Sequence, residues 1–306
     1  MLRSAILAAA RSPQVERLVH AAPITRAVVR RFIAGTTAED ALACTRTLAD
    51  EGLAVSLDYL GEDTLTPDQA TAARDEYVRL LGALGAAGLT PAAEVSVKLS
   101  ALGQKFDEET AFAHAYAVCA AAVQVGTTVT LDMEDHTTTD STLEILGRLR
   151  EDFPSTGAVL QSYLRRTEAD CRELATAGSR VRLCKGAYSE PESVAYQSKL
   201  DVDKSYVRCL NILMAGKGYP MIATHDPRLI SIGEDRAKWF NRPPEDFEFQ
   251  LLYGVRPEEQ RRLAAAGYTV RVYVPYGTQS YGYLMRRLAE RPANMVFFAR
   301  ALSSRR

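Results

Sequence analysis

Residues 128–163 read TVTLDMEDHTTTDSTLEILGRLREDFPSTGAVLQSY, and this stretch decides the fold. It begins with a short β-branched segment, Thr128–Met133, and ends with a second apolar segment, Ala158–Tyr163. A longer stretch with helical period separates the two. Parallel strands need a crossover connection of this kind, which is usually a helix. The stretch therefore predicts a strand, a helix and a second, parallel strand.

The same alternation recurs along the chain. A helix start is marked at Thr66, where Pro67 and Gln69 complete a capping-box pattern, and more weakly at Thr167 with Asp170. Glycines just before strands suit left-handed helix ends, at Gly88, Gly126, Gly178 and Gly267. The segments expected as strands are Leu53–Leu60, Glu94–Leu99, Thr128–Met133, Ala158–Tyr163, Arg180–Cys184, Met221–Thr224, Phe247–Leu252 and Thr269–Val274. Eight such units predict an α/β fold, a closed (βα)₈ barrel of the TIM type.

Length and composition fit one catalytic domain over residues 1–306. We expect residues 1–36 to form an N-terminal helical extension and residues 37–306 to form the barrel. Barrels of this kind routinely fill about 250 residues as a single domain. The hydrophobic share of 47% and the charged share of 25% are ordinary for a globular protein. The net charge of −1 creates no field that attracts nucleic acid, so we expect no such partner.

Cysteine usage and the N-terminus bear on the compartment. The five cysteines are scattered and form no C-x-x-C pair, which disfavours a disulfide framework or a zinc site and favours a reducing compartment, the cytoplasm. No stretch approaches the roughly 20 apolar residues of a membrane-spanning helix. The first 31 residues carry six arginines and one acid, Glu16. They fit either a solvated pair of amphipathic helices or a weak docking surface for a partner or the inner face of the cell membrane.

Polar residues share one side of several expected strands. Ser96 and Lys98 alternate with valines and a leucine, and the same period of two recurs at Ser56 and Asp58, Thr130 and Asp132, Glu248 and Gln250, and Arg271 and Tyr273. An antiparallel sheet with one wet face gives this pattern too, but the intervening helices must cover the apolar face here. The polar face therefore lines the barrel interior, where charges need partners. We expect Asp58 and Glu248 to pair with Arg271, and Asp132 to pair with Lys98.

The C-terminal strand ends of barrel enzymes carry the catalytic groups. In this chain they carry Lys98, Asp132, Gln161, Arg182, Lys185, Thr224, His225, Gln250 and Tyr273. Cations outnumber carboxylates in this set, which favours an anionic substrate. In the last expected helix, Tyr283, Arg286, Arg287 and Glu290 share one face. That face is either an exposed salt-bridged surface or, because the turn at 275–277 places the helix at the catalytic end, a forked binding site for a carboxylate.

These residue types leave several chemistries open. Lys98 and Lys185 are compatible with a Schiff-base aldolase. Asp132, His136 and His225, with two further acids, are compatible with a metal-dependent hydrolase, although no H-x-H or H-E-x-x-H spacing supports a metal site. Lys185-Gly186-Ala187 directly after a strand suits a phosphate group. No G-x-G-x-x-G or P-loop motif follows a strand.

Six motifs, in order and in register with the expected strands, resemble proline dehydrogenase. They are VSVKLSAL at 95–102, LDME at 131–134, VRLCKGAY at 181–188, ATH at 223–225, FEFQ at 247–250 and YLMRRL at 283–288. The resemblance runs from about residue 28 to the C-terminus. Because the chain ends after the barrel, it is similar to the monofunctional bacterial type rather than to the bifunctional proteins with an aldehyde dehydrogenase domain. Methylenetetrahydrofolate reductase, another flavin barrel, and a non-catalytic ligand-binding barrel are the alternatives.

The resemblance implies an FAD-dependent oxidoreductase that acts on the CH–NH group of L-proline. The family oxidises proline to Δ1-pyrroline-5-carboxylate by hydride transfer to flavin N5 and passes the electrons to a membrane quinone, in the first step of proline catabolism to glutamate. The catalytic positions are Asp132, which matches an ion-paired acid of the substrate pocket, and Arg182, which matches the arginine near flavin N5. The resemblance implies no metal site. It implies that the substrate is bound by Lys98, Tyr273, Tyr283, Arg286 and Arg287. It implies that FAD is bound by Met133, Gln161, Arg182, Lys185, Gly186, Ala187, Thr224, His225 and Glu290.

Three single positions refine this comparison. A tyrosine at 273 matches enzymes for proline rather than for 4-hydroxyproline. Ser189 stands where the bifunctional relatives carry tryptophan, which changes the expected contacts at the adenine end of FAD. Asp226 stands where many relatives carry asparagine.

Overall fold

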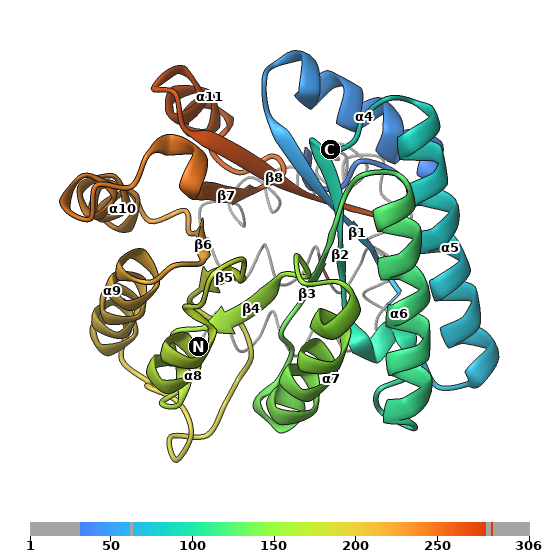
Figure 1. The fold of residues 1–306 in the computed structure, drawn as a ribbon, viewed down its shortest axis with the longest axis horizontal. Coiled ribbons are helices and arrows are strands. Elements are labelled where there is room, and N and C mark those ends of the chain that lie inside the picture. Colours follow the sequence, from blue (N-terminus) through green and yellow to red (C-terminus); the bar gives the residue numbers. More distant parts are fainter. Residues whose placement is uncertain (1–30, 62–63, 280–282, 284–306) are drawn as a thin grey trace, which may run out of the picture.

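The computed structural model describes residues 31–61, 64–279 and 283. In this part of the chain eight parallel strands form one sheet, in the order β3-β2-β1-β8-β7-β6-β5-β4, that curls into a nearly closed barrel (Figure 1). The strands are β1 (Ala54–Tyr59), β2 (Ala93–Val97), β3 (Val129–Leu131), β4 (Ala158–Gln161), β5 (Arg180–Cys184), β6 (Tyr219–Ala223), β7 (Glu248–Leu252) and β8 (Thr269–Tyr276). The predicted (βα)₈ barrel is confirmed.

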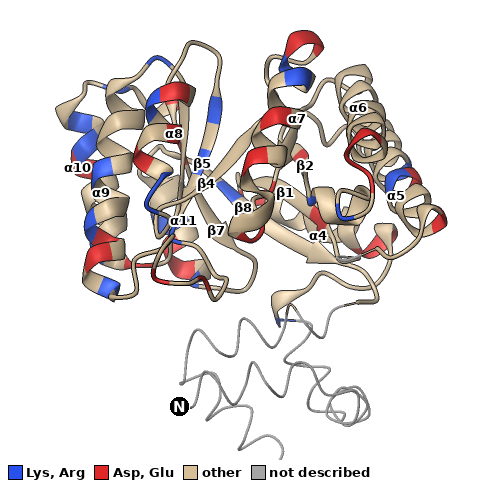
Figure 2. Cartoon of the chain, turned by 90° about the horizontal axis from the view of Figure 1, so that it is seen from below, with Lys and Arg blue, Asp and Glu red and all other residues tan. Residues whose placement is uncertain are grey.

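Helices cover the outside of the barrel (Figure 1). They are α4 (Ala38–Asp50), α5 (Pro67–Ala86), α6 (Glu108–Gln124), α7 (Thr139–Asp152), α8 (Thr167–Leu174), α9 (Lys199–Ala215), α10 (Pro227–Trp239) and α11 (Pro257–Ala265), with short 3₁₀ turns η1 (Leu99–Leu102), η2 (His136–Thr138) and η3 (Pro244–Asp246). Basic and acidic residues are interspersed along these helices (Figure 2). No helix of the described residues is long and apolar enough to cross a membrane.

The helix ends follow from local sequence, with two exceptions at α8. Thr66 caps α5 as predicted, but the side chain of Gln69 accepts from the backbone N–H of Leu65 rather than of Thr66. The predicted cap at Thr167 is wrong. Thr167 is the first residue of α8, and its hydroxyl donates to the carbonyl oxygen of Gln161 in the preceding turn instead of capping the helix. Gly88, Gly126 and Gly267 have positive φ angles directly after α5, α6 and α11, as expected for helix ends. Gly178 also has a positive φ angle, but it lies four residues after the end of α8, in the turn before β5, so its assignment to a helix end is wrong.

The barrel closes at the seam between β3 and β4 through one glycine. Gly157 forms a parallel bridge with Thr130, and its carbonyl oxygen accepts from Leu131 N at 2.9 Å. A Cβ atom at position 157 would lie 2.6 Å from Thr130 Oγ1, so no larger residue fits without a shift of the strands. This close approach lets β3, the shortest of the eight strands in the described part, complete the barrel.

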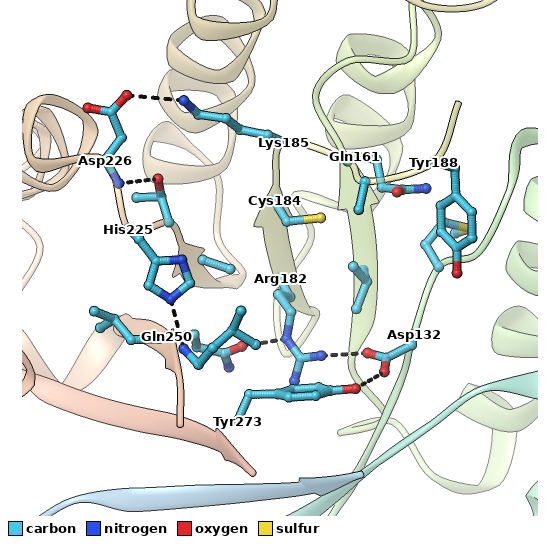
Figure 3. Close-up of a pocket in the computed structure, with 18 of the residues that line it drawn as sticks. Asp132, Gln161, Arg182, Cys184, Lys185, Tyr188, His225, Asp226, Gln250 and Tyr273 are labelled. Carbon is cyan, nitrogen blue, oxygen red and sulfur yellow. Dashed lines mark hydrogen bonds and ion pairs between the residues drawn. The ribbon is translucent and has the colours of Figure 1, made fainter. Parts of the chain in front are cut away.

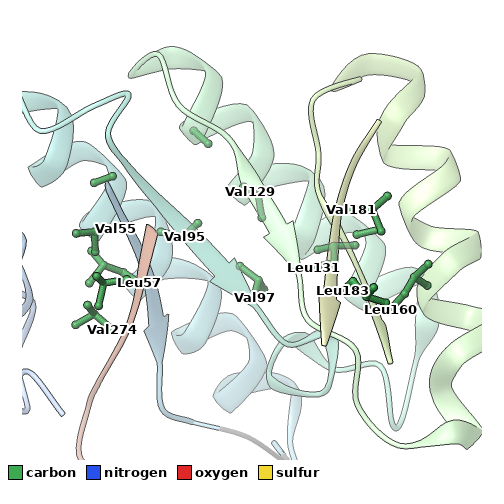
Figure 4. Close-up of a cluster of buried hydrophobic side chains, with 14 of the residues drawn as sticks. Val55, Leu57, Val95, Val97, Val129, Leu131, Leu160, Val181, Leu183 and Val274 are labelled. Carbon is green, nitrogen blue, oxygen red and sulfur yellow. The ribbon is translucent and has the colours of Figure 1, made fainter. Parts of the chain in front are cut away.

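The main hydrophobic core lies between the strands and the helices. Alternate strand residues such as Val55, Leu57, Val97, Leu183 and Val274 point into it and are almost fully buried (Figure 4). Each side chain of this size stabilises the fold by roughly 1.5–3 kcal/mol when buried. The helices therefore cover the apolar face of the strands, and the polar face lines the barrel interior.

All eight expected strands match the observed ones to within two residues at each end. The expected strand Thr128–Met133 is observed as β3, which ends at Leu131, so that Asp132 and Met133 follow the strand and border a cavity. The expected extension at 1–36 lies largely outside the described residues, and so does the helix expected after β8, apart from Tyr283.

Candidate active site

A cavity of about 670 Å³ opens at the C-terminal ends of the strands (Figure 3). Every predicted site residue in the described part of the chain lines it. These residues are Lys98, Asp132, Met133, Gln161, Arg182, Lys185, Gly186, Ala187, Thr224, His225, Tyr273 and Tyr283. Arg286, Arg287 and Glu290 lie outside the described residues. Segments up to 185 residues apart in sequence, from Lys98 to Tyr283, thus meet in one place.

Below the cavity, the barrel interior holds a layer of paired charges. Arg271 donates to both carboxylate oxygens of Glu248, at 2.8 and 3.1 Å, as predicted. Glu94 accepts from Arg180 at 2.7 Å and lies 3.8 Å from Arg271. Burial by itself would raise the pKa of Glu94, but the charges of Arg180 and Arg271 outweigh it and lower this pKa to about 2. The charges of this layer are thus paired within the barrel interior.

The predicted pair between Asp58 and Arg271 is wrong. In the register of β1 and β8, Arg271 lies opposite Ala54, whereas Asp58 lies opposite Pro275, four residues further along. Asp58 is therefore one layer higher. Both of its carboxylate oxygens accept from Lys98 Nζ, at 2.7 Å each.

Asp132 is the centre of the upper layer. It accepts from Arg182 Nη1 at 2.6 Å, from the Ser96 hydroxyl at 2.7 Å and from the Tyr273 hydroxyl at 2.6 Å. Burial would raise the pKa of Asp132, but the charges of Lys98 and Arg182 and these hydrogen bonds outweigh it and lower the pKa below its usual value. Asp132 is therefore a carboxylate near neutral pH, which makes it an acceptor that holds its neighbours in place.

Lys98 and Tyr273 lie beside Arg182 in the same network around Asp132. Lys98 Nζ lies 3.2 Å from the Tyr273 hydroxyl and 3.5 Å from Asp132, so the predicted pair with Asp132 is present but longer than the pair with Asp58. Burial, together with the charges of Asp132 and Asp58, raises the pKa of Tyr273 well above its usual value. The phenol therefore keeps its proton. A Schiff-base lysine must act as a neutral amine, and the two contacts with Asp58 instead hold Lys98 as an ammonium donor.

Arg182 is held on both sides of its guanidinium group. It donates to Asp132 and Ser96 on one side and to the amide oxygen of Gln250 on the other (Figure 3). Its guanidinium carbon lies 5.3 Å from the centre of the Tyr273 ring. With 5% of its surface exposed, Arg182 is a fixed donor at the floor of the cavity.

Two further polar groups have their orientation set by the backbone. His225 accepts at Nε2 from the backbone N–H of Leu252, 2.9 Å away, so its ring proton is on Nδ1 (Figure 3). Gln161 donates through Nε2 to the carbonyl oxygen of Glu134 at 2.7 Å. Each side chain therefore presents a defined donor or acceptor before any ligand binds.

One end of the cavity is cationic. Lys185 contacts Asp203 at 2.6 Å and Asp226 at 3.1 Å, and both carboxylates also bind Lys199 and Arg228. Three cations thus share two carboxylates. Burial would raise the pKa of Asp226, but hydrogen bonds from Arg228 and Lys185 outweigh it and lower the pKa far below its usual value.

Sequence reasoning missed part of this cluster. Lys199 and Asp203 are four residues apart, the spacing that pairs charges on a helix, and only this signal was available for them. Cys184 also borders the cavity, and burial raises its pKa to about 11, which keeps it a thiol near neutral pH. Among the residues described, no group of three His, Cys, Asp or Glu side chains could hold a metal ion.

Comparison with known proteins gives one consistent family. The family model for proline dehydrogenase matches residues 41–300. The chain is 40% identical to proline dehydrogenase from Deinococcus radiodurans over 99% of this chain and 98% of that protein. It is 37% identical to proline dehydrogenase 1 from Bacillus subtilis over 91% of each chain.

A solved structure shares the fold. The crystal structure of proline utilization A from Bdellovibrio bacteriovorus, inactivated by N-propargylglycine, superimposes with a TM-score of 0.81 at 26% identity. The match covers 87% of this chain and 33% of that one, so this chain spans about a third of the longer protein.

Proposed function

We propose that this chain, which belongs to the proline dehydrogenase family and is an oxidoreductase, oxidises L-proline to Δ1-pyrroline-5-carboxylate with FAD as its cofactor. The observation that carries the proposal is the buried network of Lys98, Asp132, Arg182 and Tyr273 at the floor of a cavity of about 670 Å³. In such a network the protein supplies orientation and electrostatics, while a bound cofactor supplies the redox chemistry.

The residues around the cavity fit FAD in three respects. Apolar groups at Met133, Val159 and Leu251 offer a surface for a flat ring system. Gln161, Thr224 and His225 offer polar atoms for its edges. The excess cation in the cluster around Lys185 offers a partner for a diphosphate. When bound, FAD supplies a hydride acceptor at N5 and passes the electrons on to a quinone.

The charge balance of the upper layer indicates how a carboxylate substrate is held. Its four charged side chains are Lys98 and Arg182 against Asp58 and Asp132. This set is already neutral, so a substrate carboxylate needs additional cations. We assign that role to Arg286 and Arg287 of the expected last helix, acting with Lys98. Their forked guanidinium groups suit a carboxylate better than a point charge does.

The remaining roles follow from the same arrangement. Tyr273 and Tyr283, both at the cavity, provide aromatic surface for the proline ring. Asp132 holds Lys98, Arg182 and Tyr273 in fixed positions through its carboxylate. Arg182 is the proposed hydrogen-bond donor to the flavin. Such prior orientation lowers the barrier, because the groups need no rearrangement when the substrate reacts.

The visible spectrum of the purified protein tests the proposal. We expect a yellow protein whose flavin absorption is bleached by L-proline under anaerobic conditions. D-proline serves as the control, since its carboxylate and ring cannot occupy the same positions together. A colourless protein that does not take up added FAD, or a bound flavin that L-proline leaves oxidised, would contradict the proposal.

Quinone as the electron acceptor gives a second, separable test. A membrane quinone requires the enzyme to work at the membrane surface, and the arginines among residues 1–31 are the proposed contact, from a location in the cytoplasm. We expect the protein to sediment with vesicles containing anionic lipid and quinone, and to release them at high salt. Absence of binding would leave the oxidation of proline intact but remove the membrane contact.

A further inference from the structure

The segment between β5 and α9, residues 185–198, forms one wall of the cavity. Its first four residues, Lys185 to Tyr188, border the cavity directly, and Lys185 and Tyr188 flank it in Figure 3. The segment has no helix or strand of its own until α9 begins at Lys199. Its shape must therefore be set by contacts with neighbouring elements.

Tyr163, just after β4, organises this segment. Its backbone N–H donates to Lys185 O at 2.9 Å, and its carbonyl oxygen accepts from Tyr196 N at 2.8 Å. Its ring packs against Gly186, where φ is +103° and a Cβ atom would lie 2.3 Å from the ring. Both ends of the segment are thus fixed to one residue.

Glu190 fixes the middle of the segment to a different part of the barrel. Its side chain is 3% exposed. It accepts from the backbone N–H of His136 at 3.0 Å, from Nδ1 of the His136 ring, and from the Tyr163 hydroxyl at 3.2 Å. His136 begins η2 in the loop after β3. Glu190 therefore bridges the loops after β3 and β5, across the end of β4.

A carboxylate this deeply buried is stable only when its oxygens are satisfied by donors, as they are here. Tyr163 remains a donor, because burial and then the charge of Glu190 raise its pKa well above its usual value. The backbone on either side is tied down too. Gln197 Nε2 donates to Glu190 O at 3.1 Å, and Arg165 Nε donates to Glu192 O at 3.1 Å.

We propose that Glu190 is a positioning residue, which holds the Lys185–Tyr188 wall in the shape that receives FAD by bridging His136 and Tyr163. This inference rests on the proposed use of FAD. If the Lys185–Tyr188 wall adopts its binding conformation in only a fraction of the molecules, the apparent affinity for FAD falls in proportion to that fraction. Loss of the hydrogen bonds to the buried charge of Glu190 corresponds to a change of about tenfold or more in the equilibrium between the binding conformation of the wall and its other conformations.

The test compares Glu190→Gln with Glu192→Gln. Glu192 is on the same segment and is exposed, so its substitution removes the same charge without disturbing the bridge. Two measurements are made on each holoenzyme: the rate of FAD release on dilution, followed by flavin fluorescence, and backbone hydrogen exchange over residues 185–197. The KM for proline at saturating FAD is measured in parallel.

For Glu190→Gln we expect FAD release to be about tenfold faster and hydrogen exchange to rise across the segment. We expect the KM for proline to stay the same, since Lys98, directly after β2, and Tyr273, on β8, lie outside this segment. Tyr163→Phe keeps the ring but loses one donor, so its effect should be intermediate. If Glu190→Gln does not fold, His136→Gln carries the test, because the His136 side chain is 32% exposed and its replacement leaves the buried carboxylate of Glu190 in place.

Three outcomes separate this inference from the proposed function. A wild-type protein that binds no FAD would contradict the proposed function and leave nothing for Glu190 to position. A wild-type protein that binds FAD, with Glu190→Gln releasing it at the wild-type rate, would overturn the inference alone. Equal effects from Glu190→Gln and Glu192→Gln would also overturn it, because the effect would then come from net charge.

Discussion

Replacing Glu94 by glutamine tests the role of the lower charged layer. Glu94 is 1% exposed. One carboxylate oxygen lies 2.7 Å from Arg180 Nη2, and the other accepts from the Thr130 hydroxyl at 3.1 Å. Glutamine has nearly the same shape, so the substitution removes the charge while leaving the volume of the side chain in place.

The size of the effect follows from the pKa of Glu94. It falls from 4.5 to about 2 because the charges of Arg180 and Arg271 outweigh the effect of burial. At about 1.4 kcal/mol per pH unit, this difference corresponds to about 3 kcal/mol of stability near neutral pH. Removing one partner of a buried ion pair typically destabilises a protein by about 3–5 kcal/mol. Both routes predict that Glu94→Gln lowers the free energy of unfolding by about 3 kcal/mol.

The pH dependence has a definite sign. Because the pKa of Glu94 is lower in the folded state, its contribution is complete above pH 4.5 and is lost as the pH falls towards 2. Urea unfolding followed by circular dichroism, repeated from pH 7 to pH 3, should show the difference between wild type and Glu94→Gln shrinking in this range. Glu109→Gln, which breaks an exposed pair with Arg148, should change little at any pH. A variant as stable as wild type at pH 7, or a difference that stays constant down to pH 3, would refute the reasoning.

Three further substitutions address the site and the seam. Tyr273→Phe removes a hydrogen bond to the charged Asp132 and a contact with Lys98, so we expect a stability loss of about 1.5–3 kcal/mol and a higher KM for proline; an unchanged KM would show that the hydroxyl does not position Lys98. Arg286→Lys should raise the KM for proline strongly in steady-state assays, because a point charge cannot replace a fork, and an unchanged KM would count against a carboxylate contact. Gly157→Val places a Cβ atom 2.6 Å from Thr130 Oγ1 and should lower the free energy of unfolding by about 1–3 kcal/mol, measured by thermal unfolding. A variant as stable as wild type would mean that β3 and β4 can move apart at the seam without a loss of stability.

The fold was predictable because each level of the sequence indicates the same structure. Thr66 with Pro67 starts α5, and alternating residues such as Ser96 and Lys98 separate an interior face from a helix-covered face. The pairing of Glu248 with Arg271 followed from residues of opposite charge on adjacent strands.

Two of the failures have different physical causes. The partner of Asp58 depends on the stagger between β1 and β8, which sets height within the barrel, and alternation along one strand carries no information on stagger. Thr167 failed as a cap because its hydroxyl bonds to the carbonyl oxygen of Gln161, a contact set by the path of the preceding turn.

The site was predictable only where it follows strand ends. Lys98 and Asp132 directly follow β2 and β3, Arg182 and Tyr273 lie within β5 and β8, and all four border the cavity as expected. Glu190, by contrast, lies in a segment without periodicity, and its partners are 27 and 54 residues away. Contacts of this kind depend on the path of a loop through space, which the local sequence does not specify.

The most direct test of the account is a crystal structure of the protein with FAD and an unreactive cyclic carboxylate analogue of proline. The account predicts that the carboxylate lies within about 3 Å of Lys98 Nζ and of the guanidinium groups of Arg286 and Arg287, with the flavin against Arg182. A carboxylate bound away from Lys98, or a flavin bound outside the cavity at the C-terminal strand ends, would contradict it.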